Sequence, residues 1–145
     1  MKIRCVTYKD EFSVGGKAMN DLLIGQSRGI VGCGSKVFGS SSTGDLIVIN
    51  AEENGNKHVI IGIILEKIED CHVWQEEGGH MWPYNFTYKP LTKMFTLDKE
   101  TKKEIEEISK KIGVNKHNIF NSRFCSVKCK EIVDMLINKY ELGTS

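Results

Sequence analysis

The chain has 145 residues and a mass of 16.4 kDa, which is the size of one domain with room for a sizeable core. Its 40% hydrophobic and 27% charged residues exclude global disorder. The formal net charge of +1 excludes a histone-like binder with a wholly cationic surface, but it leaves room for a local basic patch.

Charge is distributed unevenly along the chain. Residues 1–50 carry six basic and four acidic side chains, a balance of +2. Residues 51–100 carry five basic and nine acidic side chains (−4), and residues 101–145 carry nine and six (+3). If the two basic ends fold next to each other, we expect a polarised surface.

The cysteines and the apolar runs indicate where such a chain works. There are five cysteines and no CxxC pair, which is an odd count at low density. We therefore expect a reducing, intracellular compartment such as the cytoplasm. The N-terminus has no signal-peptide pattern, and the longest apolar run, residues 59–65, falls well short of the about 20 residues that span a membrane. We predict no membrane association.

The first third of the chain predicts a strand, a helix and a glycine-rich loop. Residues 2–8 alternate and are rich in β-formers, so they predict a strand. Residues 17–24 have helical spacing, and Gly25 is expected to end that helix. Residues 29–33 predict a short strand that leads into the Gly- and Ser-rich stretch 32–44. Because that stretch lies within the domain, we interpret it as a shaped loop that approaches another group closely.

The middle of the chain predicts a hairpin and an aromatic strand. Gly44-Asp45 is a turn signal before the apolar strand 46–50, and Asn54-Gly55 is the strongest hairpin signal because both residues accept a positive φ. Residues 59–67 predict a long strand with Gly62 as a bulge or kink. A further strand over 82–89 has four aromatic residues on one face at a period of two: Trp82, Tyr84, Phe86 and Tyr88.

From Asp98 onward the pattern becomes helical. Asp98 is suited to cap a helix that runs through Lys111, and Gly113 stands at the position expected for its C-terminal glycine. Ser126 is suited to cap the last helix. The buried stripes of the two helices are predicted to be Ile105, Ile108 and Ile112 in the first, and Cys129, Ile132, Val133, Leu136, Ile137 and Tyr140 in the second.

The order of these elements predicts the fold class. Strands come first and helices follow, which is typical of an α+β domain. We predict a single domain over residues 1–145, with a small curved sheet or barrel over 1–97 and C-terminal helices over 98–145 packed on it.

Metal binding is weakly indicated. Ligand-type side chains occur at Cys71, His72 and His80, and Cys125-x3-Cys129 has a spacing found in zinc sites. Cys129, however, lies on the apolar stripe of the last helix, where a buried thiol is ordinary. Since no second close pair exists, we predict no metal and no cofactor.

The sequence also offers few catalytic groups. Cys33 stands between two glycines, in what we interpret as an exposed position suited to a nucleophile, but such a residue needs a converging histidine. The histidines are scattered and lack a diagnostic context: His58, His72, His80 and His117. Neither GxxxxGK[ST] nor GxGxxG is present, although residues 39–44 can offer backbone N–H groups to an anion. We predict no catalytic residue.

Aromatic and basic residues near the loops are more informative. Trp82 stands where a loop becomes a strand, and there it can form the wall of a pocket in which a base stacks for roughly 1–3 kcal/mol. Lys36 in the Gly/Ser stretch is a candidate phosphate contact, together with Ser41 and Ser42. The alternative interpretation is that the aromatic residues are core and that Lys36 is simply solvated.

Four segments resemble a known superfamily over residues 1–97. IRCVTYKDEF resembles the opening strand and turn of PUA-like readers of modified bases, in the YTH and EVE branches. GIVGCGSKVFGSSSTGDLIVIN resembles their next block, in which a glycine-led segment delivers pocket residues. NGNKHVIIGIILEKIED and HMWPYNFTYKPLTKMF resemble the following hairpin and the Trp-containing segment. The opening strand lacks the Trp typical of EVE proteins, and Tyr8 is the candidate to replace it.

The resemblance implies a PUA-like mixed β-barrel with packed helices and a C-terminal helical extension. It implies a non-catalytic module that binds DNA or RNA by accepting a modified base in an aromatic pocket, and we expect that base to be methylated. The expected pocket residues are Tyr8, Lys9, Asp10, Asn20, Gly34, Ser35, Lys36 and Trp82.

Two alternatives remain open. The first is a hydrolase of a modified nucleoside or nucleotide, as in the neighbouring ASCH branch, which would recruit Lys9, Asp10, Cys33 and Lys36. The second is a protein-interaction module whose partner binds the C-terminal helices. Turnover, Trp82-dependent binding without turnover, and loss of partner binding on truncation after Leu97 distinguish the three hypotheses.

Overall fold

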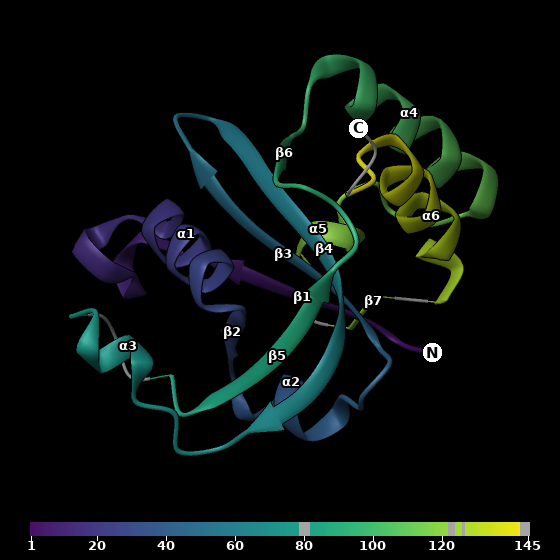
Figure 1. Ribbon diagram of the computed structural model, residues 1–145. Helices are drawn as coiled ribbons and strands as arrows, with labels where there is room; N and C mark the ends of the chain where they lie inside the picture. The colour runs from purple at the N-terminus through teal and green to yellow at the C-terminus, as the bar shows by residue number, and fades with distance from the viewer. Residues whose placement is uncertain (79–81, 122–123, 126, 143–145) are drawn as a thin grey trace.

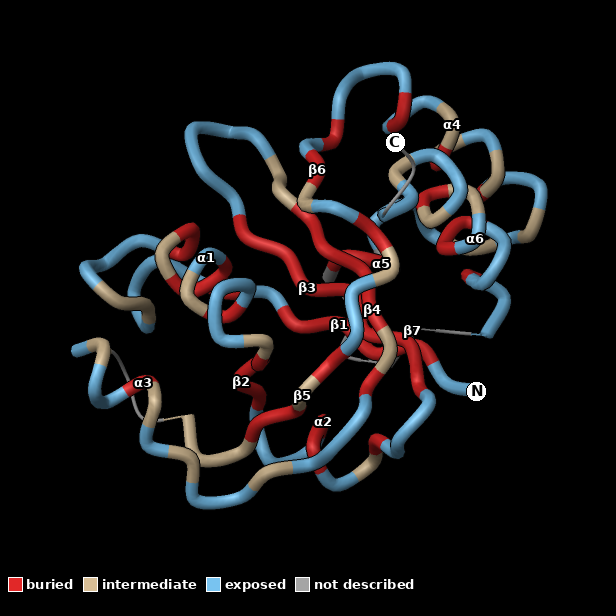
Figure 2. The backbone as a smooth tube through the Cα atoms, viewed as in Figure 1, coloured by how far each residue is buried: buried red, intermediate tan, exposed pale blue. Residues whose placement is uncertain are grey.

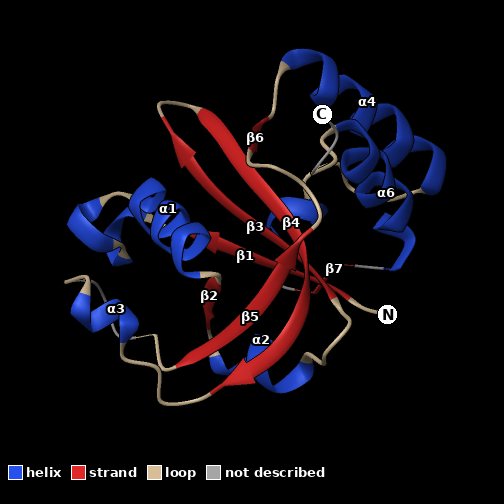
Figure 3. Ribbon diagram, in the orientation of Figure 1, coloured by secondary structure: helices blue, strands red, loops and turns tan. Residues whose placement is uncertain are grey.

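The structure is a computed structural model, and it describes residues 1–78, 82–121, 124–125 and 127–142. It is a mixed α+β fold (Figure 3). The strands are β1 (Ile3–Tyr8), β2 (Ile30–Cys33), β3 (Leu46–Glu53), β4 (Asn56–Ile68), β5 (Tyr84–Pro90), β6 (Phe95–Thr96) and β7 (Phe124–Cys125). The helices are α1 (Ala18–Arg28), α2 (Ser35–Ser40), α3 (Val73–Glu76), α4 (Lys99–Ile112), α5 (Asn118–Asn121) and α6 (Lys130–Lys139). Short 3-10 turns are η1 (Asp10–Phe12), η2 (Val14–Gly16) and η3 (Val127–Cys129).

The strands form one curled sheet (Figure 1). Its order is β2-β5-β4-β3-β1-β7, with β6 paired to β4. The β1–β3 pair is parallel and the other pairs are antiparallel. Among the described residues, β2 stands at one end of this order and β7 at the other, so the sheet is an open half-barrel.

Alternation along the central strands divides the interior into two cores, one on each face of the sheet. Val6 and Tyr8 of β1 belong to a core covered by α1, which we call the α1-side core. Ile3 of the same strand belongs to a core covered by α4 and α6, the α4-side core. Figure 2 shows the buried strands between these two groups of helices. The period of two in side-chain direction lets one sheet bury both faces.

Several local predictions are confirmed. Strands begin and end close to the predicted positions in β1, β2, β3 and β4. Asn54 and Gly55 form the hairpin turn with φ values of 52° and 79°. Asp98 caps α4 by accepting a hydrogen bond from the Thr101 N–H at 2.7 Å, and Gly113 ends that helix with a φ of 74°.

The predicted end of the first helix is wrong. The helix continues through Gly25 to Arg28, and Gly29, with a φ of 69°, provides the left-handed stop. The reason for Gly25 is packing: a Cβ there would lie 2.6 Å from the Ile30 carbonyl oxygen. A glycine within the helix therefore lets α1 approach the start of β2 closely.

Three further predictions need correction, and a fourth falls on a residue that the structure does not describe. The Gly/Ser stretch contains the short helix α2. Gly62 is no bulge: the register of β4 shifts between Ile64 and Glu66, and Gly62 instead leaves room for the Lys89 carbonyl, 2.7 Å from where a Cβ would stand. The aromatic strand starts at Tyr84, so Trp82 precedes it. The predicted cap Ser126 lies outside the described residues.

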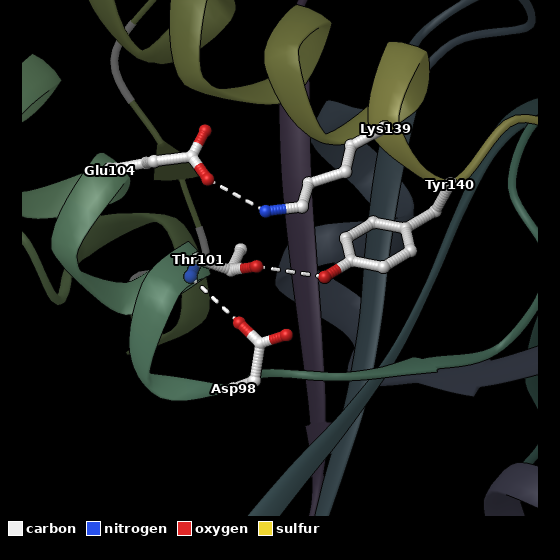
Figure 4. A network of polar contacts seen from close by, with 5 residues as sticks. All are labelled: Asp98, Thr101, Glu104, Lys139 and Tyr140. Carbon is white, nitrogen blue, oxygen red and sulfur yellow. Dashed lines mark hydrogen bonds and ion pairs between the residues drawn. The ribbon is translucent and has the colours of Figure 1, made fainter.

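A small clasp joins α6 to α4 (Figure 4) and, through Phe95, to the sheet. The Tyr140 ring stacks on Phe95 with centroids 4.0 Å apart and planes 1° from parallel. The Tyr140 and Thr101 hydroxyls share a hydrogen bond of 2.8 Å, and the Lys139 Nζ donates to Glu104 at 2.6 Å. The clasp ties α6 to α4 and to β6. None of the described helices has the length and apolar character needed to cross a membrane.

Candidate functional site

The curl of the sheet brings β1 close to β2, and a hollow of about 390 Å³ lies between β1 and the β2–α2 segment. We call it the Trp82 hollow. Its volume is in the range of small-ligand sites. The residues that line it come from β1, η1, β2, α2 and the loop before β5: Cys5, Val6, Thr7, Lys9, Phe12, Gly32, Cys33, Gly34, Ser35, Lys36, Val37 and Trp82.

The lining has a distinct chemical character. Its two charged side chains, Lys9 and Lys36, are both cationic, and among the described lining residues there is no carboxylate and no histidine. Two aromatic residues also line it: Trp82, which is partly buried, and Phe12, which is 43% exposed. Such a surface suits a ligand that combines a planar apolar part with a negative charge.

Trp82 is held in place by its neighbours. A Cβ at Gly32 would stand 2.8 Å from Trp82 Cβ, so only glycine lets this residue pack so closely on β2. The Trp82 carbonyl accepts a hydrogen bond from Asn85 Nδ2 at 2.6 Å, and Asn85 Oδ1 accepts another from Trp74 Nε1 at 2.8 Å. Trp74 and Asn85 are fully buried. The wall of the hollow is therefore fixed before any ligand arrives.

Tyr8 lies behind the hollow and supports it. The side chain is only 3% exposed, and its hydroxyl accepts a hydrogen bond from the Gly32 N–H at 3.1 Å. Its ring packs edge-on against Trp82, with centroids 6.3 Å apart. Burial raises the pKa of the Tyr8 hydroxyl well above its ordinary value. Tyr8 thus links β1 to β2 across the curl of the sheet, and its ring is core.

Asp10 and Asn20 brace the turn that carries part of the lining. Asp10 Oδ1 accepts a hydrogen bond from the Ala18 N–H at 2.8 Å, and Asn20 Nδ2 donates to the Val14 carbonyl at 2.8 Å. Neither residue is among the described residues that line the hollow. Their polar groups hold the turn from η1 to α1, which presents Lys9 and Phe12.

Of the eight residues expected in the pocket, the structure brings five together around the hollow: Lys9, Gly34, Ser35, Lys36 and Trp82. Gly34 precedes α2, and its carbonyl accepts the Phe38 N–H at 3.0 Å. The first turn of α2 then carries Ser35 and Lys36, both exposed.

Ser41 and Ser42 lie after α2, apart from the described lining. The Ser41 hydroxyl is buried and donates to the Val37 carbonyl, while the Ser42 N–H donates to Asp45 Oδ2 at 2.9 Å. Asp45 Oδ1 accepts the Lys2 N–H at 3.0 Å. The carboxylate of Asp45 therefore already occupies a backbone donor of the loop in which we expected an external anion.

The interpretation of Cys33 as an exposed residue is wrong. The side chain is 3% exposed, because it sits in the paired strand β2 and belongs to the α1-side core. Burial raises the pKa of the Cys33 thiol to about 12 and that of the Cys5 thiol to about 11. Thiolates, the nucleophilic form, are therefore disfavoured at both positions.

Some lining residues were missed by sequence reasoning. Phe12 had a usable signal, since it is a large aromatic residue in a polar turn. Cys5, Thr7 and Val37 had none, because their part in the lining depends on the curl of the sheet.

The metal ligands considered above do not assemble in the described part of the chain. There, no group of three or more His, Cys, Asp or Glu side chains is placed to hold a metal ion. Cys129 is fully buried in the α4-side core. His80 and the side chain of Cys125 lie outside what the structure describes. Cys5, Cys33, Cys71 and Cys129 are free thiols.

No model of a protein family matches the chain, and a search of curated proteins finds no similar sequence.

Proposed function

We propose that the protein binds nucleic acid by accepting a single unpaired base, expected to be methylated, in the Trp82 hollow. The observation that carries this proposal is the composition of the lining. An indole and a phenyl ring offer stacking surfaces, two lysines offer phosphate contacts, and the described lining holds no carboxylate that would repel a phosphate. Stacking on an aromatic side chain contributes roughly 1–3 kcal/mol per base.

The rigidity of the wall supports the same proposal. Asn85 donates one hydrogen bond to the Trp82 carbonyl and is itself held by Trp74, while Gly32 lets Trp82 pack closely on β2. A preformed wall reduces the ordering cost of binding. This matters because leaving the base stack already costs a few kcal/mol.

We further infer that the fold is a PUA-like half-barrel of the EVE and YTH type. The supporting features are the curled α+β sheet and the helix α1 between β1 and β2. The position of the hollow, bordered by the opening strand, the glycine-led segment and the Trp-containing segment, agrees with the arrangement that the sequence resemblance implies.

The hydrolase alternative has little support from the lining. The pKa of Cys33 is raised rather than lowered, and Asp10 Oδ1 already accepts a backbone hydrogen bond. We therefore propose a binding module with no catalytic residue. Turnover of modified nucleosides that is lost in Lys36→Ala would overturn this proposal in favour of the hydrolase.

Binding of nucleic acid tests the proposal directly. Single-stranded oligonucleotides of about eight nucleotides, each with one methylated base, are titrated by fluorescence anisotropy beside their unmodified versions. Trp82→Ala is expected to weaken binding of the preferred ligand at least tenfold. Lys36→Gln is expected to weaken it about threefold and to reduce its salt dependence, because a phosphate contact is lost.

Lys17→Gln is the matched control for the lysine. Lys17 is exposed, precedes α1 and is not part of the described lining, so its removal tests the effect of bulk charge. Binding that survives Trp82→Ala would reject the hollow as the base site. An equal effect of Lys17→Gln and Lys36→Gln would reject the phosphate contact.

A further inference from the structure

A second hollow, of about 430 Å³, lies where the β3–β4 hairpin meets α4 and α5. We call it the α4 hollow. Lys57, Lys102, Lys116 and His117 line it together with the carboxylates of Glu52 and Glu106, and Phe120 is among its apolar residues. This part of the surface belongs to the C-terminal helices, which the sequence resemblance does not explain.

The acidic residues of the α4 hollow leave some of its lysines without a carboxylate partner. Glu106 is shared by Lys110 and Lys116, each at 3.5 Å, and these cations lower the pKa of its carboxyl. Lys57 Nζ instead donates to Asn50 Oδ1 at 3.4 Å and lies 5.5 Å from the centre of the Phe120 ring. Within the described ion pairs, neither Lys57 nor Lys102 has a carboxylate partner. Both cations are available to an anionic ligand. Lys116 is held only by its 3.5 Å pair with Glu106, and an ion pair between two such exposed side chains contributes little in water, so Lys116 can also contact a phosphate.

A third hollow connects the α4 hollow to the Trp82 hollow. It has a volume of about 530 Å³ and lies beside the β3–β4 turn. It shares Thr7 and Lys9 with the Trp82 hollow, and Glu52, Gly55 and Lys57 with the α4 hollow. Asp10 also lines it, so its charged residues are of both signs. The concave surface therefore continues from Trp82 past Lys9 and Lys57 to the helix α4. We call this continuous surface the trough.

We propose that the nucleic-acid strand whose base enters the Trp82 hollow continues along the trough, and that Lys57, Lys102 and Lys116 bind its phosphates. This inference rests on the proposed function. It makes the ligand single-stranded, because a base in the hollow must be unpaired and because a single strand can follow a path from the sheet edge to a helix. It also gives the C-terminal helices a role as a second anchor for the same strand.

Two probes separate the trough from the hollow. A methylated nucleoside monophosphate can fill only the Trp82 hollow, whereas a single strand of about eight nucleotides with the same central base can reach both regions. The double variant Lys102→Gln/Lys116→Gln removes two cations of the α4 hollow. The double variant Lys99→Gln/Lys103→Gln removes two exposed cations of α4, the helix that carries Lys102, and neither is in the described lining.

The expected result is specific to the trough variant. The wild-type protein is expected to bind the oligonucleotide at least about tenfold more tightly than the monophosphate. Lys102→Gln/Lys116→Gln weakens oligonucleotide binding about fivefold to tenfold and reduces the slope of log K against log salt concentration by about 1.4, which is about 0.7 for each of two phosphates. Binding of the monophosphate is unchanged, and the control variant stays within about twofold for both ligands.

Other results overturn the inference. Equal losses of oligonucleotide affinity in the two double variants would show that only the overall charge of the protein matters, and would reject the trough. An oligonucleotide that binds no more tightly than the monophosphate would reject the trough and leave the base hollow standing. Tighter binding of the matching duplex would reject the single strand as ligand. If the wild-type protein binds neither probe, both the proposed function and the proposed binding along the trough are rejected.

Discussion

The two faces of the sheet are built from different side chains. The α1-side core contains the buried rings of Tyr8, Phe38, Trp74, Phe86 and Tyr88. The α4-side core is mainly aliphatic, and its aromatic contribution is concentrated around Phe95, Phe120 and Tyr140. The first core ends in the Trp82 hollow, whereas the second is covered by α4 and α6.

The difference shows how a core can be built to border a binding surface. Aliphatic side chains fill volume without making directional hydrogen bonds. Trp and Tyr combine apolar area with a polar atom that needs a hydrogen-bond partner. Trp74 Nε1 and the Tyr8 hydroxyl find theirs in Asn85 and Gly32, and these bonds fix the wall beside the hollow. The α1-side core therefore holds the wall of the hollow in a defined position, whereas the α4-side core packs the C-terminal helices on the sheet.

Trp74→Ala is expected to have the largest effect and tests directly whether the two cores differ in their role. The side chain is fully buried, so we expect the free energy of unfolding to fall by about 3–5 kcal/mol in urea denaturation. Leu136→Ala in the α4-side core is the matched variant and should cost about 2–5 kcal/mol. Only Trp74→Ala should also weaken ligand binding in the Trp82 hollow. Equal effects of the two variants on binding would contradict the division of roles.

Alkaline pH should act next most strongly. Burial raises the pKa of Cys33 to about 12 and that of Cys5 to about 11, from an ordinary value of 9.0. A raised folded pKa gives stability that is fully present below pH 9 and is lost as pH rises toward the folded values. Each thiol costs roughly 1.4 kcal/mol per pH unit in that window. Thermal denaturation from pH 8 to 11 measures this fall, and Cys33→Ala should make it shallower. A flat profile would show that the thiols are less buried than described.

Gly32→Ala tests the packing of Trp82 on β2. The added Cβ would stand 2.8 Å from Trp82 Cβ and Cγ, so we expect a loss of about 1–3 kcal/mol and a shift of the indole. Tryptophan fluorescence and urea denaturation report the two effects. Gly34→Ala is the control, because nothing lies within 4 Å of its added Cβ and its φ of −77° suits any residue. Should the two variants behave alike, the close packing of Trp82 on β2 would be disproved.

Tyr140→Phe is expected to have the smallest effect. It removes the hydrogen bond to Thr101 but keeps the ring stacked on Phe95, so the free energy of unfolding should fall by about 0.5–1.5 kcal/mol. A double-mutant cycle with Thr101→Val isolates that bond. Ligand binding in the Trp82 hollow should not change. Weaker binding in Tyr140→Phe would mean that the clasp and the hollow are coupled.

The sequence by itself determined the elements that depend on local chemistry. The Asn54-Gly55 turn, the Asp98 cap and the Gly113 stop each follow from the backbone preferences of a few neighbouring residues. The alternation of β1 and the existence of the aromatic strand were also predictable, although that strand begins at Tyr84 and not at Trp82. The two-faced arrangement of the sheet follows from such alternation once the strands pair.

Tertiary structure decided what each candidate residue faces. Gly25 is the helix end that the sequence predicts, but the structure packs Gly25 against the Ile30 carbonyl and ends α1 at Gly29. Tyr8 became core because Gly32, 24 positions later, supplies its hydrogen-bond partner. Cys33 is buried for a similar reason, since β2 pairs with β5. Exposure arises from contacts between residues distant in the sequence, and only the curled sheet brings those residues together.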